Sequence, residues 1–425
     1  MIYLKILGGG LEVGRVGLEI IDRNKAILLD YGINFDEEDR PQYPLHVKPS
    51  ELSSIVISHA HLDHVGAAPS LYVTGETPLY TTEPTLEISK ILINDFLKIS
   101  GYYADYDIIE VNNMVRNTRV IDYGVETEVE GFTIILTNAN HILGSSMIYL
   151  ETPSGYRILY TGDFNNIETK TLPPLEFSFR DIDILIIETT YGSKKHPPRK
   201  LVEKEFVNDI EEVVESGGTV LIPAFSVGRT QEVLAIIYEN APHLDVYVDG
   251  MSKDITTLYL KYLHLLKNPS LFRKIVENTY FVRGWEDRRK IWKRECVIVA
   301  SAGMLNGGPS LYYLKKIYEN EKNAVFIVSY QSPNSYGHKI LESGSLDEIG
   351  LGRVKARVKW FDLSSHAGRD GLLEIVSRFK NSLKHVIAIH GEPDSAHFFA
   401  NSVKTSIDKD LEIHVPSNGE VLELT

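Results

Sequence analysis

Side chains that can bind metal ions are concentrated in one short segment of the chain. The segment reads His59-Ala60-His61-Leu62-Asp63-His64. It follows the apolar run Ser53 to Ser58, which predicts a buried strand ending in this loop. Imidazole nitrogens and carboxylate oxygens are donors that zinc prefers, and a loop at a strand end can direct alternate side chains towards two neighbouring positions. We expect the first two histidines to bind one ion, and the aspartate and the last histidine to bind a second.

Two ions need roughly eight to ten donor positions, so further ligands must come from distant segments. Three candidates each follow a strand-like run: His141, Asp163 and His390. The glycine before Asp163 would let the backbone approach the metal, so that this carboxylate could bridge both ions. Alone, each candidate is better explained as a hydrogen-bonded core histidine or a turn aspartate. Together with the histidine loop they indicate a two-metal site.

Many short β-type runs, separated by turn residues, occupy residues 1–200. After an initial run at Ile2 to Leu7, they are Leu18 to Ile21, Ala26 to Asp30, Ile55 to Ser58, Phe132 to Thr137, Met147 to Leu150, Arg157 to Thr161 and Ile184 to Ile187. Residues 86–99 have apolar side chains at helical spacing, which adds a helix to this β-rich part. We therefore predict a layered α/β sandwich.

From about Lys200 the pattern changes to helices that alternate with fully apolar strands. These strands are Thr219 to Pro223, Asp245 to Val248, Val297 to Ala300 and Ala324 to Ser329. Such alternation is typical of a parallel, doubly wound, Rossmann-like sheet. Isolated strands that carry histidines return near Lys359, at Trp360 to Leu363 and Val386 to His390. We predict one domain over residues 1–200 and 352–425, with a second domain inserted over residues 201–351.

Composition limits the class of protein. The hydrophobic content of 43% is that of a folded globular chain, and no apolar run is long enough to span a membrane. Residues 1–7 have the pattern of a strand instead of a signal peptide. The single cysteine, Cys296, lies in an apolar run, which predicts a buried thiol and a reducing, cytoplasmic compartment.

A net charge of −14 argues against nonspecific coating of nucleic acid, because affinity for phosphates comes from basic side chains. One local basic track stands out, with the cations Arg283, Arg288, Arg289, Lys290, Lys293 and Arg294. Trp285 and Trp292 are interleaved with these cations, a combination that could follow phosphates and stack on bases. A solvated helix face with Trp292 in the core explains the same residues. The sequence favours neither interpretation.

These motifs resemble the metallo-β-lactamase superfamily, and specifically its β-CASP nucleases, over essentially the whole chain. Asp30, in Leu28-Leu29-Asp30-Tyr31-Gly32, matches the first motif, and the resemblance implies a carboxylate that orients the metal loop without binding metal. The histidine loop, His141 and Asp163 match the next three. The resemblance implies an αββα sandwich with an inserted β-CASP domain, and two zinc ions per chain.

Three further motifs distinguish the β-CASP group. They look like Glu188 in Glu188-Thr189-Thr190-Tyr191-Gly192, His366 in Ser364-Ser365-His366-Ala367-Gly368, and His390 in His390-Gly391-Glu392. A histidine at the last motif is typical of RNA-directed members, where DNA-directed members usually have valine. The resemblance therefore implies a zinc-dependent ribonuclease acting on single-stranded RNA, with Asp63, Glu188 and His366 as catalytic residues.

The insertion contains further segments that resemble β-CASP sequences. We expect phosphate contacts with RNA from Arg229, Ser301, Ser329 and Ser365. The subgroup resembled is the archaeal CPSF-like and RNase J-like proteins of the short form without N-terminal KH domains, which suggests a homodimer formed near residues 412–424 and a place in an RNA-processing or decay complex. Gly368 stands where exonucleases tend to have a serine that holds the 5′ phosphate. The sequence thus leaves endonuclease and 5′–3′ exonuclease action open.

The predicted mechanism is hydrolysis without a covalent intermediate. A hydroxide held with Asp163 between two zinc ions would attack phosphorus in line with the leaving 3′ oxygen. His366 would protonate that oxygen, and Glu188 would hold the tautomer of His366 and raise its pKa. The alternatives are a small-molecule hydrolase of the glyoxalase II or lactamase type, a DNA nuclease of the same fold, and a catalytically silent subunit of an RNA-processing complex.

Overall fold

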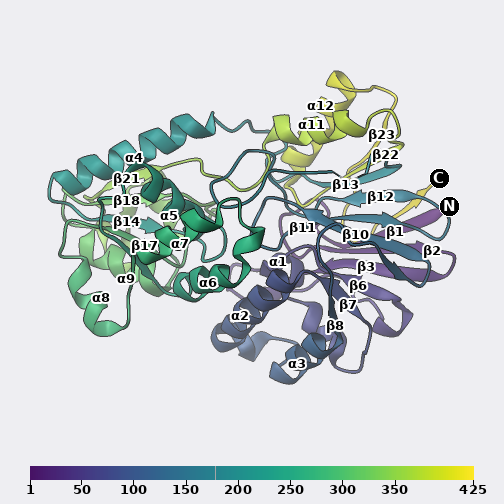
Figure 1. The fold of residues 1–425 in the computed structure, drawn as a ribbon, viewed down its shortest axis with the longest axis horizontal. Helices are drawn as coiled ribbons and strands as arrows, with labels where there is room; N and C mark the ends of the chain where they lie inside the picture. Colours follow the sequence, from purple (N-terminus) through teal and green to yellow (C-terminus); the bar gives the residue numbers. More distant parts are fainter. Residues whose placement is uncertain (178) are drawn as a thin grey trace. The chain divides into compact units, whose positions relative to one another are not determined.

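Strands with alternating apolar side chains build two seven-stranded sheets in the first of two units of the chain (Figure 1). The structure is a computed structural model, and it describes residues 1–177 and 179–425. Unit 1 comprises residues 1–167, 174–195 and 366–425, and unit 2 comprises residues 168–173 and 196–365. The predicted insertion, 201–351, is shorter than unit 2.

The first sheet of unit 1 has the strand order β24-β1-β2-β3-β6-β7-β8. Its strands are β1 (Ile2–Gly8), β2 (Gly17–Asp22), β3 (Lys25–Tyr31), β6 (Ser54–Val56), β7 (Leu79–Thr81), β8 (Thr118–Val120) and β24 (Val421–Leu424). The strands from β3 to β8 pair in parallel, and Leu28 lies opposite Ile55. Because parallel strands end at the same edge, Asp30 on β3 lies beside the loop that follows β6.

The second sheet has the order β23-β22-β13-β12-β11-β10-β9. Its strands are β9 (Thr127–Val129), β10 (Phe132–Asn138), β11 (Ser146–Glu151), β12 (Arg157–Tyr160), β13 (Ile184–Glu188), β22 (His385–Ile389) and β23 (Glu412–His414). Strand β13 precedes unit 2 and β22 follows it, and the two pair in parallel with Glu188 opposite Ile389. The chain therefore leaves the second sheet after β13 and returns to it at the neighbouring strand β22.

The sheets of unit 1 form the two inner layers of a four-layer sandwich. Buried side chains of both sheets, such as Ile6 and Ile134, share one core. The outer face of the first sheet packs against α1 (Leu62–Val65), α2 (Glu83–Ser100), α3 (Ile108–Asn117) and the 3₁₀ helix η2 (Ala68–Tyr72). The outer face of the second sheet packs against α11 (Arg369–Phe379) and α12 (Pro393–Ser406), as Figure 1 shows. The predicted αββα sandwich is confirmed.

Helix α2 begins at a capping threonine and holds a loop that carries a candidate ligand. The Thr82 side chain accepts a hydrogen bond from the Thr85 N–H, which satisfies one of the otherwise unpaired amides of the first turn. The hydroxyls of both threonines also donate to the Gly144 carbonyl, at 2.8 and 2.9 Å. This contact fixes the end of the loop that begins at His141.

Unit 2 is built around a six-stranded sheet in which every pair is parallel, with the order β16-β15-β17-β14-β18-β21. Its strands are β14 (Val220–Pro223), β15 (Val246–Asp249), β16 (Thr279–Phe281), β17 (Val297–Ala300), β18 (Ala324–Ile327) and β21 (Arg357–Trp360). Its helices are α4 (Arg199–Glu215), α5 (Arg229–Asn240), α6 (Ser252–Tyr259), α7 (Pro269–Glu277), α8 (Trp285–Ile291), α9 (Gly308–Ile317) and α10 (Tyr336–Glu342). Fully apolar strands joined by helices give a parallel sheet, as predicted.

One predicted strand is placed differently by the structure. The sequence pattern put a strand at 360–363 and assigned it to the first domain, whereas β21 covers Arg357–Trp360 and pairs in parallel with β18 of unit 2. The Phe361 N–H still donates to the Ile327 carbonyl, and the Leu363 side chain is buried without belonging to a strand. Cross-strand pairing, which a local apolar pattern does not encode, decides this assignment.

The short remaining elements complete the chain. Two small hairpin sheets are β4 (Asn34–Phe35) with β5 (Pro41–Gln42), and β19 (Ser345–Leu346) with β20 (Gly352–Arg353). The other 3₁₀ turns are η1 (Pro49–Glu51), η3 (Gly101–Tyr103), η4 (Leu260–Leu265) and η5 (Asp347–Ile349). Among the residues that the structure describes, no helix is both long and apolar enough to cross a membrane.

Cys296 lies directly before β17 and is almost completely buried. Burial and the nearby Asp245 carboxylate raise the pKa of its thiol to about 12. Because only the thiolate reacts with disulfide reagents, we expect no modification by dithiobis-nitrobenzoate at pH 8 in the native protein. One thiol per chain should react promptly in guanidinium chloride, which serves as the control. Rapid modification of the native chain would contradict this prediction.

Candidate metal centre

The histidine loop is shaped by the end of β6 and the single turn of α1. The Ser58 N–H and hydroxyl both donate to the Asp30 carboxylate, at 2.7 and 2.6 Å, which fixes the entry to the loop. His61 is the N-cap residue of α1, and Asp63 and His64 lie within its turn. The His64 ring packs beside the His59 ring, with the ring centres 4.0 Å apart.

Two groups of four side chains converge at this edge, and each group offers ligand atoms within 4.8 Å of one another. Cluster A consists of His59, His61, His141 and Asp163. Cluster B consists of Asp63, His64, His390 and Asp163. Asp163, which follows β12, therefore belongs to both clusters.

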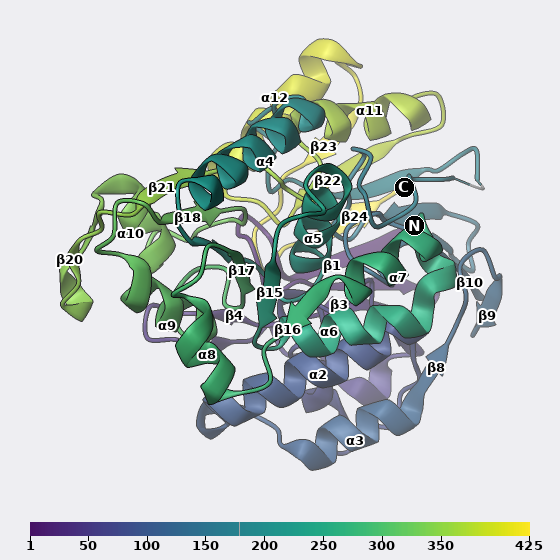
Figure 2. The same ribbon diagram turned by 60° about the vertical axis from the view of Figure 1, so that its left-hand side comes forward.

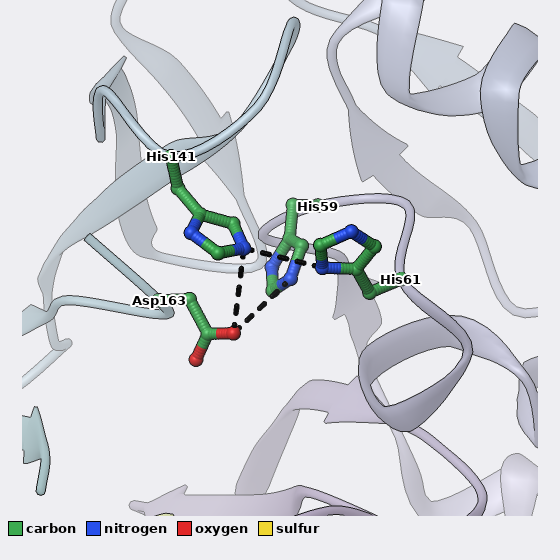
Figure 3. Close-up of side chains that lie close together, drawn as sticks. All are labelled: His59, His61, His141 and Asp163. Carbon is green, nitrogen blue, oxygen red and sulfur yellow. Dashed lines mark hydrogen bonds and ion pairs between the residues drawn. The ribbon is translucent and has the colours of Figure 1, made fainter. Parts of the chain in front are cut away.

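The donor atoms of cluster A face a common centre (Figure 3). His141 Nε2 lies 3.1 Å from His61 Nδ1, and Asp163 Oδ2 lies 3.5 Å from His59 Nε2 and 3.6 Å from His141 Nε2. Ligands of a tetrahedral zinc ion at bond lengths of about 2.1 Å are about 3.4 Å apart. The spacing in cluster A therefore fits a zinc ion.

Cluster B has similar spacing around the other carboxylate oxygen of Asp163. Oδ1 lies 3.3 Å from His64 Nε2 and 3.5 Å from His390 Nε2. His64 donates from Nδ1 to the Asp30 carboxylate at 2.7 Å, which leaves its Nε2 lone pair facing the cluster. A carboxylate behind a histidine is the usual support for a metal ligand, because it fixes the tautomer and the ring orientation.

Buried polar atoms without hydrogen bonds mark both clusters. Within the described residues, the buried atoms His59 Nε2, His64 Nε2 and Asp163 Oδ1 have no hydrogen-bond partner. Such atoms cost free energy unless another group satisfies them. A cation in each cluster would satisfy all three, so the residues fit a pair of metal ions.

The ionisation of the side chains also suits metal binding. Burial and the neighbouring His59 lower the pKa of His61 to about 3, and burial holds the pKa values of His59 and His141 below the usual range. These three imidazoles are therefore neutral, as metal ligands must be. Burial opposes ionisation of Asp163, but His64 and His390 outweigh it and hold the pKa of Asp163 well below the usual value.

His64 has the opposite shift. Burial alone would lower its pKa, but the carboxylates of Asp163, Asp30 and Asp63 raise it well above the usual value. Three carboxylates around one imidazole create a strongly negative site, which favours a proton or a divalent cation. A metal ion in cluster B would take the place of that proton.

His390 is held differently from the other imidazoles. The backbone N–H of His390 donates to the Gly9 carbonyl at 2.7 Å, and the backbone N–H of Gly14 donates to the ring nitrogen Nδ1 of His390 at 3.2 Å. The other ring nitrogen, Nε2, faces Asp163 at 3.5 Å and Asp63 at 3.7 Å, so a cation in cluster B would bind at this nitrogen.

His366 and Glu188 form a pair beside cluster A. His366 Nδ1 lies 3.0 and 3.1 Å from the two Glu188 oxygens, and its Nε2 lies 3.9 Å from Asp163 Oδ2. The Phe164 N–H donates to Glu188 Oε1 at 3.1 Å and orients the carboxylate. Burial would lower the pKa of His366, but Glu188 and Asp163 outweigh it and raise the pKa to about 9. This shift favours the protonated form of the ring at neutral pH.

Two side chains that support Asp30 were missed by the sequence reasoning. Besides Ser58, the Tyr160 hydroxyl donates to Asp30 Oδ2 at 2.6 Å, from β12 of the opposite sheet. Asp30 therefore links both sheets directly behind the metal centre. A local signal existed, because Ser58 directly precedes the loop and Tyr160 lies three residues before Asp163.

Gly32 packs against the backbone of the metal loop. A Cβ atom at this position would lie 1.8 Å from the Asp63 carbonyl oxygen. We expect Gly32→Ala to push the loop out of place, to lower the zinc content and to destabilise the chain by about 1–3 kcal/mol. Metal analysis and chemical unfolding would measure both effects. In the matched control Gly101→Ala, the nearest atom lies 3.9 Å away, so metal content and stability should not change.

The predicted phosphate contacts all lie in unit 2. Arg229, Ser301 and Ser329 stand just beyond the carboxyl ends of β14, β17 and β18, where open parallel sheets usually bind ligands. The Arg229 guanidinium donates to the Ser365 hydroxyl at 3.3 Å. Gln331 donates to the carbonyls of Gly303 and Ser329, which joins the two serine-bearing loops. The buried Ser329 hydroxyl has no hydrogen-bond partner in the described part of the chain.

A four-layer sandwich with paired histidine and aspartate clusters at one sheet edge defines a metal-dependent hydrolase of the metallo-β-lactamase type. Three family models match the chain in sequence order: the metallo-beta-lactamase superfamily domain at residues 19–183, the Beta-Casp domain at 230–340, and the Zn-dependent metallo-hydrolase RNA specificity domain at 352–416. RNase aCSPSF2 of Saccharolobus solfataricus is 47% identical and covers 99% of this chain and 85% of that protein. The chain belongs to the β-CASP family of the metallo-β-lactamase superfamily.

Two further proteins are similar over the whole chain. The transcription termination factor FttA of Methanocaldococcus jannaschii is 34% identical, and the match covers 100% of this chain and 72% of that protein. A crystal structure of a protein of unknown function from Enterococcus faecalis V583 matches with a TM-score of 0.64 and 16% identity, and covers 100% of both chains. The second likeness concerns the fold alone.

Proposed function

We propose that the chain is a zinc-dependent ribonuclease that hydrolyses phosphodiester bonds of single-stranded RNA. The observation that carries this proposal is the position of Asp163, which belongs to both ligand clusters and lies 3.9 Å from His366. A general acid beside a two-metal site is an arrangement that suits phosphodiester hydrolysis, because the acid can protonate the leaving oxygen. The matched RNA specificity domain and the relative named RNase aCSPSF2 support RNA as the polymer.

Two zinc ions per chain are proposed as the cofactors. His59, His61 and His141 would hold one ion, and Asp63, His64 and His390 would hold the other, with Asp163 shared between them. Zinc in such sites lowers the pKa of bound water to about 7, and so supplies hydroxide at neutral pH and polarises the phosphoryl oxygens.

The protein groups act on protons around this centre. His366 would donate the proton on its Nε2 to the leaving 3′ oxygen, while Glu188 accepts from its Nδ1–H and stabilises the charged ring. Asp63 has a side chain that is 31% exposed, so it can contact the attacking water and accept its proton. Asp30 would keep the loop and His64 in place through its four hydrogen bonds.

RNA would bind to unit 2 through its phosphates. Arg229 offers a fixed positive charge for a phosphate, and Ser301, Ser329 and Ser365 offer hydroxyl groups to the same kind of ligand. His390, the residue that the resemblance connects with RNA-directed members, supports RNA over DNA as substrate. Endonuclease and 5′–3′ exonuclease action both fit these contacts.

The test is a cleavage assay with four labelled substrates: 5′-triphosphate RNA, 5′-monophosphate RNA, circular RNA and single-stranded DNA. We expect cleavage of RNA and not of DNA. Cleavage of the circle would demonstrate endonuclease action, and dependence on a 5′ monophosphate would demonstrate exonuclease action. Cleavage of a thioester or of DNA alone would overturn the proposal. A metal analysis that finds less than one zinc ion per chain would also overturn the proposal. That result would favour a catalytically silent subunit of an RNA-processing complex.

We further propose a homodimer in a reducing cytoplasm. Strands β23 and β24 lie at the edges of their sheets and offer unpaired backbone groups for pairing with a second copy. Light scattering would measure the mass in solution, and a monomer at micromolar concentration would overturn the proposed homodimer.

The proposed compartment rests on Cys296, which is buried and forms no disulfide within the described residues, as expected in a reducing compartment. Membership of an RNA-processing or decay complex would appear as co-purifying proteins.

A further inference from the structure

A surface pocket of about 550 Å³ lies on unit 2 and is lined by aromatic and basic side chains. Its lining residues are Trp285, Arg289, Trp292, Lys293, Tyr312 and Lys316. Pockets that hold small organic groups have volumes of roughly 300–1,000 Å³, so this one could take a nucleobase with its sugar. We call it the aromatic–basic pocket.

The lining residues lie on α8, directly after its end, and on α9. Figure 2 shows these two helices next to each other. Trp285, Arg289 and Trp292 have the i, i+4, i+7 spacing that places side chains on one helical face. Tyr312 and Lys316 are four residues apart on α9, and the Tyr312 ring meets the Trp285 ring edge-on at 5.6 Å. Trp292 packs against the buried core of unit 2, whereas the Trp285 side chain is 58% exposed. The pocket therefore has a fixed base and an open aromatic wall.

The structure separates the basic track of the sequence into two sets of cations. Arg288 donates to both oxygens of Asp249, at 2.6 and 2.7 Å, and Lys290 pairs with Glu286 at 2.7 Å. By contrast, in the part of the chain that the structure describes, no carboxylate pairs with Arg289, Lys293 or Lys316. These three cations all line the pocket, and none of its lining residues is acidic.

Two of these three cations lie next to aromatic rings of the pocket. Lys293 Nζ lies 5.2 Å from the centre of the Trp292 ring, and Lys316 Nζ lies 5.7 Å from the centre of the Tyr312 ring. Contacts of this kind position a cation at little cost and leave its hydrogen-bond donors available. In a chain with a net charge of −14, three uncompensated cations around exposed rings form a local site for a polyanion with flat groups.

We infer that the aromatic–basic pocket binds single-stranded RNA, with a base stacked on Trp285 or Tyr312 and flanking phosphates on Arg289, Lys293 and Lys316. Stacking platforms joined to cations are the usual means of holding single strands without reading their sequence. An acidic peptide would use the cations and not the rings, so the exposed tryptophan favours nucleic acid. The choice of RNA as the polymer rests on the proposed ribonuclease function.

The test measures binding of a fluorescein-labelled oligouridine by anisotropy, with the full chain in EDTA so that the RNA stays intact. Stacking of one base changes affinity by a factor of about 5 to 100, so Trp285→Ala should weaken binding by that factor. The double variant Lys293→Gln/Lys316→Gln should reduce the slope of log Kd against log salt by about 1.4, because two phosphate contacts are lost. Unchanged thermal unfolding would show that both variants are folded.

Lys315→Gln is the matched control, because Lys315 is exposed on α9 next to Lys316 and does not line the pocket. It should bind oligouridine as the parent chain does. Binding that is equal in all variants would overturn the inference, and so would competition by polyglutamate that is as strong as competition by polyuridine. RNA cleavage by the parent chain is measured in a separate assay. If the parent chain does not cleave RNA but its binding depends on Trp285, only the proposed ribonuclease function is refuted. If the parent chain cleaves RNA but the pocket variants bind RNA as the parent does, only the inference about the pocket is refuted.

Discussion

Replacement of Asp163 by asparagine is expected to lower kcat for RNA cleavage by about 10³-fold or more, because metal activation contributes several kcal/mol to such reactions. Asp163 supplies one oxygen to cluster A and the other to cluster B, at 3.3–3.6 Å from the histidine nitrogens. An amide carries no charge and offers only one oxygen acceptor. Asp163→Asn should therefore weaken both metal sites at once, and zinc content should fall below two ions per chain.

Metal analysis after gel filtration and cleavage of labelled RNA measure the two consequences. The matched control is Asp181→Asn, because the Asp181 side chain is 60% exposed and its ion pair with Arg157 is loose, at 3.6 Å. This variant should keep two zinc ions and full activity. If Asp163→Asn retained both ions and cleaved RNA at the parental rate, a shared carboxylate would not be part of the mechanism.

The second large effect is expected at His366. His366→Asn removes the proposed general acid, and such groups contribute about 10²–10⁴-fold to rate. The side chain lies outside both clusters, so zinc content should stay unchanged. A leaving group that needs no protonation provides the control: hydrolysis of bis(p-nitrophenyl) phosphate by His366→Asn should decline far less than hydrolysis of RNA. Equal losses on the two substrates would assign His366 to substrate binding or to structure instead.

The pH dependence of kcat for RNA cleavage should follow from the interaction of His366 with Glu188. The general acid must be protonated, so kcat should fall as pH rises through the pKa of His366, which Glu188 and Asp163 raise to about 9. Bound zinc ions act in the opposite direction, and the descending limb in the loaded enzyme should lie below pH 9. Glu188→Gln removes a charge that raises this pKa, so the limb should move to lower pH. An unchanged limb would show that another group titrates.

Most of the side chains at the candidate metal centre could be predicted from the sequence because of their position relative to the predicted strands. Asp30 and His59 lie at or shortly after the ends of strands of the first sheet, and Asp163 and His390 follow strands of the second sheet. Parallel pairing within each sheet brings such strand ends together. The sandwich itself could be predicted for the same reason, since alternating apolar runs of this length specify strands. Local pattern and long-range pairing agree at these positions.

Other features depend on contacts that no local pattern contains. The place of β21 in the sheet of unit 2 depends on its pairing with β18, and the support of Asp30 by Tyr160 crosses from one sheet to the other. The ring of His390 is oriented by a hydrogen bond from the Gly14 amide, far away in the sequence. The aromatic–basic pocket needed Tyr312 and Lys316 from a second helix, which the linear basic track from Arg283 to Arg294 did not include.

The insertion of unit 2 between β13 and β22 also has a consequence for synthesis of the protein. A nascent chain that has left the ribosome as far as residue 365 contains cluster A and Glu188, but not His366 or His390. The first sheet is also incomplete at that stage, because its edge strand β24 is made last and pairs with β1. Under the proposed mechanism, a chain that has emerged only as far as residue 365 lacks the proton donor His366, so we expect it not to cleave RNA before the remaining residues are made.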